Sequence, residues 1–204
     1  MTKLSFRELF GPLGAVLVLM LSLAGSASAS EIELSGIKVP ATVNVAGSQL
    51  VRNGAGIRYK AIFKVYVASL YLTTDKANTP AKVVAAPGPK RLVLTLLRTV
   101  KSDELGKLFA HGIEDNMDYS KFSKLVPGVM RMSGIFSKYK SLGEGETITV
   151  DWIPGKGMLV LVNGVQEGEP FKEPEFFEAM MGIWLGKSPA DWRLKDALLG
   201  KPVE

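Results

Sequence analysis

A long apolar segment, IRYKAIFKVYVASLYL at residues 57–72, limits the folds open to this chain. The segment is rich in β-branched and aromatic side chains, which strands accommodate better than helices do. We expect it to form one long strand, or two strands with a kink between them. By the two-residue period of a strand, an unbroken segment would place five side chains on one face: Arg58, Lys60, Ile62, Lys64 and Tyr66.

The rest of the pattern alternates between strand and helix signals. A cluster of turn formers at residues 53–56 (Asn-Gly-Ala-Gly) precedes the long segment, and Asn163-Gly164 is a strong hairpin signal. We expect further strands at residues 31–34, 43–45, 49–52, 90–100, 146–153 and 158–162. We expect four helices. The first follows an N-cap at Ser102 and runs to Asn116, and the second covers residues 119–139 with an interruption at Pro127-Gly128. The third covers residues 176–185 and is led by Pro174, and the fourth runs from a capping box at residues 188–191 to Gly200. This order predicts an α+β fold, a mostly antiparallel sheet with helices on one side.

The first 29 residues are typical of a secretory signal peptide. Lys3 and Arg7 precede an apolar stretch at residues 14–24, and Ala27-Ser28-Ala29 supplies the small residues that signal peptidase requires. We expect cleavage after Ala29, which leaves residues 30–204 as a single exported domain, periplasmic in a bacterium with two membranes. An uncleaved N-terminal anchor is the alternative. No later segment has the length and apolarity of a membrane span.

The composition excludes several kinds of chemistry. The chain has no cysteine, so disulfides, thiolate catalysis and zinc–thiolate sites are excluded. The single histidine, His111, falls on the polar face of its predicted helix, so we expect no metal site and no cofactor. The net charge of +5 comes from scattered lysines and arginines, which argues against nucleic-acid binding.

Two polar side chains stand where apolar ones are expected. Arg58 lies in the apolar segment after the turn cluster, and a guanidinium there needs an anionic or polar partner. That partner is either a ligand carboxylate or oxyanion, or a structural partner such as an ion pair. Asn116 falls on the apolar stripe of its helix, where it either faces a ligand or caps the helix end. Arg98 ends a strand in a similar setting, and a sheet-edge ion pair is its simpler interpretation.

The segment GAGIRYKAIFKVYVASLYL at residues 54–72 resembles the chalcone isomerase family, and its exported bacterial branch most of all. The Arg98 strand, Glu114-Asp115-Asn116, and Trp184-Leu185-Gly186 continue the resemblance over the mature chain. The resemblance implies an open-faced β-sandwich, a large antiparallel sheet covered by a layer of helices, with a ligand cleft between them. Plant members are isomerases of the intramolecular-lyase type that close chalcones to flavanones, and non-catalytic relatives bind fatty acids.

The resemblance also implies roles for four residues. The family's anion-binding arginine corresponds to Arg58 and its active-site asparagine to Asn116. Tyr66 stands where the enzymes carry a catalytic threonine, and Phe109 stands where they carry a tyrosine that polarises the substrate ketone through water. Phenylalanine has no hydroxyl to hold that water. We therefore expect an exported protein that binds a fatty acid or another small amphipathic anion through Arg58, Tyr66, Phe109 and Asn116. The alternatives are an isomerase in which Arg58 is catalytic, and an interaction protein with a vestigial cleft.

Overall fold

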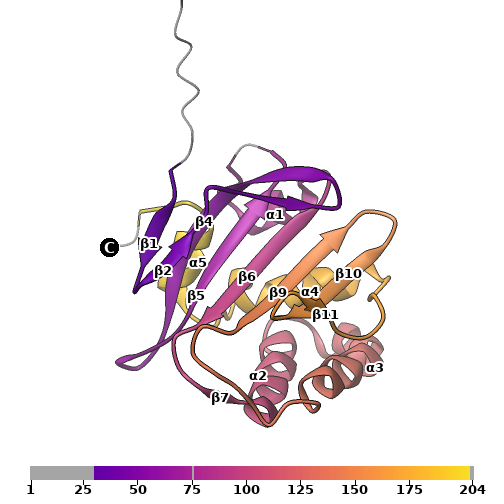
Figure 1. The fold of residues 1–204 in the computed structure, drawn as a ribbon. Coiled ribbons are helices and arrows are strands. Elements are labelled where there is room, and N and C mark those ends of the chain that lie inside the picture. Colours follow the sequence, from indigo (N-terminus) through magenta and orange to yellow (C-terminus); the bar gives the residue numbers. More distant parts are fainter. Residues whose placement is uncertain (1–29, 75, 203–204) are drawn as a thin grey trace, which may run out of the picture.

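The computed structural model describes residues 30–74 and 76–202, so the predicted signal peptide lies outside the described residues. A large curled antiparallel sheet forms one layer, and helices cover one of its faces (Figure 1). The α+β fold predicted from the order of elements is confirmed. No helix in the described ranges is long and apolar enough to cross a membrane.

The main sheet has seven strands in the order β11-β10-β9-β6-β5-β4-β3, and every neighbouring pair is antiparallel. Its strands are β3 (Thr42–Val45), β4 (Ser48–Lys60), β5 (Phe63–Leu72), β6 (Lys90–Leu96), β9 (Thr147–Ile153), β10 (Gly157–Val162) and β11 (Val165–Gln166). Two small sheets add β1 (Ile32–Leu34) with β2 (Ile37–Val39), and β7 (Val100–Lys101) with β8 (Ser141–Leu142). The predicted Asn163-Gly164 hairpin joins β10 to β11, and both of its turn residues have positive φ.

Five helices complete the described chain: α1 (Pro80–Ala85), α2 (Ser102–Glu114), α3 (Tyr119–Phe136), α4 (Pro174–Leu185) and α5 (Trp192–Leu198). The prediction of a break at Pro127-Gly128 is wrong, because α3 runs through both residues. The predicted capping box is also wrong. Asp191 is itself the N-cap of α5, and its carboxylate accepts the backbone N–H groups of Arg193 and Leu194.

Residues 57–72 form two antiparallel strands rather than one long one. β4 ends at Lys60 and β5 begins at Phe63, with a tight turn between them in which Ala61 takes φ 54°. The turn contains no glycine, asparagine or proline, so the composition of the segment gave no turn signal. The hairpin changes which residues meet, because Arg58 and Tyr66 now face each other across two strands.

The expected turn at residues 53–56 is instead part of β4. Its glycines serve close packing against α5. A Cβ on Gly54 would collide with the backbone carbonyl of Ala197, and one on Gly56 would lie 2.6 Å from the Ala197 Cβ. Glycine therefore lets α5 approach the strand where any side chain would hold it off.

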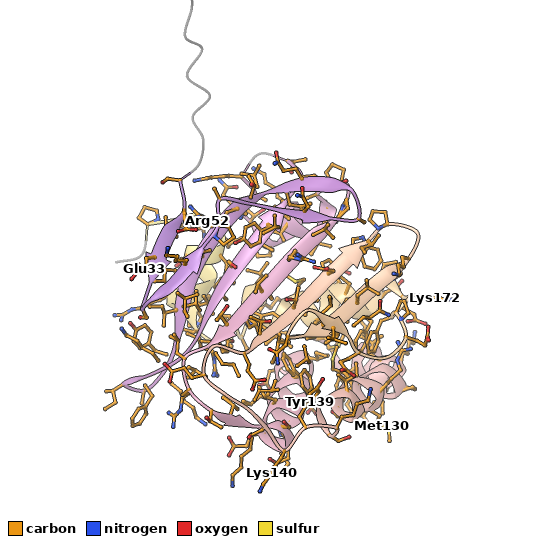
Figure 2. The ribbon with its side chains drawn as sticks, in the orientation of Figure 1. Glu33, Arg52, Met130, Tyr139, Lys140 and Lys172 are labelled. Atoms are coloured by element: carbon orange, nitrogen blue, oxygen red, sulfur yellow. The ribbon has the colours of Figure 1, made fainter. Side chains whose placement is uncertain are left out.

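Apolar side chains form one cluster on each face of the sheet. The larger cluster lies between the sheet and the helices, and the smaller one lies under the β1–β2 hairpin on the other face. Arg52 lies beside this hairpin (Figure 2) and donates hydrogen bonds to the carbonyls of Ser30, Val39 and Pro40. These hydrogen bonds hold the N-terminal hairpin against the sheet. The candidate ligand-binding residues lie on the opposite, helix-covered face.

Candidate ligand-binding cleft

A cavity of about 190 Å³ lies between the sheet, α2, α4 and the loop that leads into α5. Its inner wall is made of buried side chains, most of them apolar: Tyr66, Leu94, Leu96, Leu105, Phe109, Ile148, Ile183 and Trp184. Arg58 lies at one side, and the rim includes the more exposed Leu108, His111, Asp115 and Ser188. A largely apolar hollow with one guanidinium suits a ligand that has an apolar body and an anionic group.

Arg58 and Tyr66 are direct partners on the neighbouring strands β4 and β5, and both face the cavity. The Arg58 guanidinium carbon lies 5.6 Å from the centroid of the Tyr66 ring, a cation–π distance. The Arg58 Nε is buried and has no hydrogen-bond partner among the described residues. Within residues 30–74 and 76–202, no carboxylate lies at ion-pair distance from this guanidinium. Its hydrogen-bonding capacity is therefore open to a ligand.

The hydroxyl of Tyr66 accepts a hydrogen bond of 2.8 Å from the indole Nε1 of Trp184. Burial raises the pKa of Tyr66 to about 12, and the nearby Arg58 charge and the Trp184 hydrogen bond offset only part of that rise. The hydroxyl therefore stays protonated at neutral pH. Because its oxygen already accepts from Trp184, its own proton remains for donation to a neighbouring acceptor.

Phe109 forms part of the apolar wall. Its ring stacks on Phe136 with centroids 5.0 Å apart and meets the Trp184 ring edge-on at 6.1 Å. These contacts hold the ring in one position, and the side chain brings no polar atom into the cavity. The structure thus places Phe109 in the cavity lining, and its contact with a ligand stays a prediction.

Asn116 does not line this cavity but borders a separate, more open pocket beside Lys121 and Glu178, and its contact with a ligand stays a prediction. Its amide nitrogen donates to the carbonyls of Gly112 and Ser188, both at 2.9 Å, and its amide oxygen accepts the Ser188 N–H at 2.8 Å. Both amide protons are engaged, so the side chain has no free donor for a ligand. Asn116 instead ties α2 to the loop at Ser188, and that loop does line the cavity.

Comparison with known proteins agrees with this geometry. The model of the chalcone isomerase-like family matches residues 30–200. This chain belongs to the chalcone isomerase-like family. A search of curated proteins finds no match.

A solved structure of the same fold is a fatty-acid binding protein from Arabidopsis thaliana. The two share 14% sequence identity with a TM-score of 0.66, and the match covers 83% of this chain and 96% of the plant protein. At this identity the likeness establishes the fold. The family assignment and the fold together confirm the architecture that the sequence predicted for this chalcone isomerase-like protein.

The remaining candidate residues lie at or beyond the rim. His111 is exposed, as its helical position predicted, yet it borders the mouth of the cavity. Its Nδ1 lies 3.7 Å from the carboxylate of Glu114. Arg98 stays outside the cavity. Its guanidinium carbon lies 5.1 Å from the centroid of the Phe63 ring, and it makes none of the salt bridges found in residues 30–74 and 76–202, where an ion pair was expected.

Trp184 and the loop at 188–190 also contribute to the cavity and were missed in the sequence. Trp184 belongs to an almost wholly apolar helix, α4, where an indole is indistinguishable from core. Only the hydrogen bond to Tyr66, from a strand more than a hundred residues earlier, shows its polar role. The loop at 188–190 has no residue pattern that would mark it as part of a site, because it lines the cavity only through its position in the fold.

Proposed function

We propose that this protein binds a small amphipathic anion, such as a fatty acid, in the cavity between the sheet and the helices. The observation that carries the proposal is the Arg58 guanidinium, whose buried Nε has no partner among the described residues. A buried, unsatisfied charged donor costs free energy unless something completes its hydrogen bonds. A carboxylate matches the planar fork of a guanidinium and supplies both charge and acceptors.

The other cavity residues support the same kind of ligand. The Tyr66 hydroxyl, protonated at neutral pH, donates a second hydrogen bond to the bound anion. Phe109 and the leucines of β6 contact the apolar part. The fatty-acid binding protein of the same fold gives independent support for this class of ligand.

The volume of the cavity bears on the length of the ligand. At about 190 Å³ it is little larger than the cavities of about 150 Å³ that hold one benzene molecule. It accommodates the head group and the first carbons of a chain, or one aromatic ring. A longer chain would extend past the rim at Leu108 and His111, which are exposed.

We further propose that the protein works outside the cytoplasm, in the periplasm of a bacterium with two membranes. The basic residues Lys3 and Arg7, the apolar stretch at 14–24 and Ala27-Ser28-Ala29 support export. The family match begins at Ser30, directly after the proposed cleavage point.

Isomerase activity is the second candidate, favoured by the pairing of a guanidinium with a protonated hydroxyl in an apolar cavity. Such donors can stabilise an enolate or phenolate in a transition state. Phe109 weighs against it, because this side chain cannot hold a polarising water. A vestigial cleft is the least favoured alternative, since the cavity is open and Arg58 makes no ion pair with a described residue.

Native mass spectrometry of protein recovered from cells tests the binding proposal. We expect a co-purified carboxylic acid on the wild type, none on Arg58→Ala, and retention on the control Lys156→Ala, whose side chain is exposed between β9 and β10 and outside the cavity. Absence of any bound acid, with no binding of added octanoate or dodecanoate, would contradict the proposal. Incubation with chalcones separates catalysis from binding, because an isomerase would remove their visible absorbance faster in the wild type than in Arg58→Ala.

A further inference from the structure

The tip of the β4–β5 hairpin carries large apolar side chains in solvent. Ile62 is 84% exposed and Phe63 is 56% exposed, and Tyr59 is also exposed. The tip projects beyond the rest of the sheet (Figure 1). An apolar cluster at the end of a projecting hairpin cannot be explained by packing within the domain, and such clusters mark interaction sites.

Three exposed cations surround this apolar tip. Lys60 and Lys64 flank the turn, and the Arg98 guanidinium carbon lies 5.1 Å from the centroid of the Phe63 ring. Lys64 donates a hydrogen bond to the hydroxyl of Ser35. No acidic side chain in residues 30–74 or 76–202 lies at ion-pair distance from any of the three. The tip therefore combines apolar side chains with positive charge that no described acid neutralises.

A third exposed aromatic side chain lies next to the hairpin. The backbone N–H of Tyr59 donates to the carboxylate of Asp191, and the following residue, Trp192, is exposed. The Lys195 ammonium lies 4.7 Å from the centroid of the Trp192 ring. Tryptophan and tyrosine beside cations are the residues that favour the boundary between water and lipid.

We propose that the β4–β5 hairpin tip docks the protein on an anionic phospholipid bilayer. Ile62 and Phe63 enter the boundary between head groups and acyl chains, while Lys60, Lys64 and Arg98 pair with lipid phosphates. Charge complementarity selects this partner, because an apolar protein groove would leave three cations facing it without counter-charges. The inference does not rest on the identity of the ligand in the cavity.

The position of the tip relates docking to the cavity. Tyr66 lies four residues beyond Ile62 on the same hairpin, which at about 3.3 Å per residue is a distance of about 13 Å. Interfacial side chains enter a bilayer by about 5–10 Å. Arg58 and Tyr66 thus stay just outside the head groups, where an amphipathic anion leaving the bilayer could reach them.

The absence of cysteine permits a local test on the full chain. A single Ile62→Cys variant is labelled with the fluorophore NBD, and a Val165→Cys variant serves as the control. Val165 is also exposed, at 62%, but lies on β11, at the other end of the strand order from β3 and β4. With vesicles of phosphatidylglycerol and phosphatidylcholine we expect a blue shift and brighter emission at position 62, and quenching by lipids spin-labelled near the head group. We expect no change at position 165, even if another part of the chain contacts the vesicles.

Sedimentation with the same vesicles supplies the second measurement. We expect Ile62→Ser combined with Phe63→Ser to weaken partitioning roughly tenfold. Lys60→Gln combined with Lys64→Gln should weaken it to a similar extent on phosphatidylglycerol but leave the weak partitioning on pure phosphatidylcholine unchanged. An unchanged emission at position 62 would overturn the proposal, as would equal shifts at 62 and 165. A blue shift of the emission at position 62 that appears without vesicles and disappears on dilution would show that the tip contacts a second copy of the chain. That result would also overturn the proposal of membrane docking.

Discussion

Arg58 and Tyr66 are paired across the β4–β5 hairpin, with the guanidinium carbon 5.6 Å from the ring centroid. The pairing places a permanent positive charge beside a hydroxyl that stays protonated at neutral pH, within one apolar cavity. Neither residue is engaged by a described carboxylate. This arrangement is consistent with the proposal that the pair receives an anionic ligand, and Tyr66 also accepts the hydrogen bond of Trp184.

This arrangement predicts that binding and stability can be separated at Arg58. Arg58→Met should lower affinity for a carboxylate ligand at least tenfold, because a charged hydrogen bond is lost. The free energy of unfolding should stay within about 1 kcal/mol of the wild type, since methionine keeps an aromatic contact with Tyr66 in place of the cation–π contact. Isothermal titration with dodecanoate and urea denaturation measure the two quantities. A large loss of stability with unchanged affinity would show that Arg58 is structural.

The hydrogen bond between Trp184 and Tyr66 predicts coupling between sheet and helix. Tyr66→Phe leaves the buried indole N–H without its acceptor and should cost about 1–3 kcal/mol. In a double-mutant cycle with Trp184→Phe, the second substitution should cost less once the first has been made, with a coupling energy of about 1 kcal/mol. Urea denaturation of the four proteins gives this value, and strictly additive effects would contradict the coupling.

Asn116 should act through the loop that it holds. Asn116→Ala removes the donor to the Gly112 and Ser188 carbonyls and the acceptor of the Ser188 N–H, so we expect a loss of about 2–3 kcal/mol and faster hydrogen exchange at the Ser188 amide. Asn44→Ala is the matched control, because Asn44 is exposed on β3. Ligand affinity should fall together with protection of Ser188. If affinity fell while Ser188 stayed protected, Asn116 would contact the ligand directly.

Two glycines predict opposite effects of the same substitution. Gly54→Ala would drive a methyl group into the Ala197 carbonyl of α5, so we expect at least about 3 kcal/mol of destabilisation. Gly134→Ala lies within α3, where nothing stands within 4 Å of the new methyl group, and it should stabilise the protein by about 1 kcal/mol. Thermal and urea denaturation compare them. Equal effects would contradict the close approach of α5 to β4.

The carboxyl of Glu146 predicts part of the loss of folding stability at low pH. Hydrogen bonds from the Gly143 N–H and from the Asn163 amide lower the pKa of Glu146 below its ordinary value of 4.5. Its contribution to stability is complete above that ordinary pKa and is lost as the pH falls through the lower folded-state value. Glu146→Gln should therefore reduce the stability difference between pH 6 and pH 3. An unchanged pH profile in this variant would assign the acid sensitivity to other groups.

The local sequence patterns were sufficient for much of the fold. Asn163-Gly164 predicted its hairpin because few residues other than asparagine and glycine adopt positive φ at both turn positions. Alternation at residues 146–153 and helical spacing after Ser102 identified β9 and α2. Ala61 gave no such signal, since a turn formed by ordinary residues is imposed by the pairing of β4 with β5 and not by local preference.

The sequence by itself determined the residue types of the site, the apolar wall and the exclusion of thiol chemistry. Arg58 and Phe109 could be singled out from the sequence, because a guanidinium in an apolar segment stands out and the family resemblance points to both; the structure places both at the cavity. The tertiary structure decided which polar groups meet: it engaged Asn116 with the backbone of Ser188, joined Trp184 to Tyr66, and left the Arg58 Nε without a hydrogen-bond partner among the described residues. Hydrogen bonds between residues distant in the chain depend on packing geometry, which no local pattern of residues records.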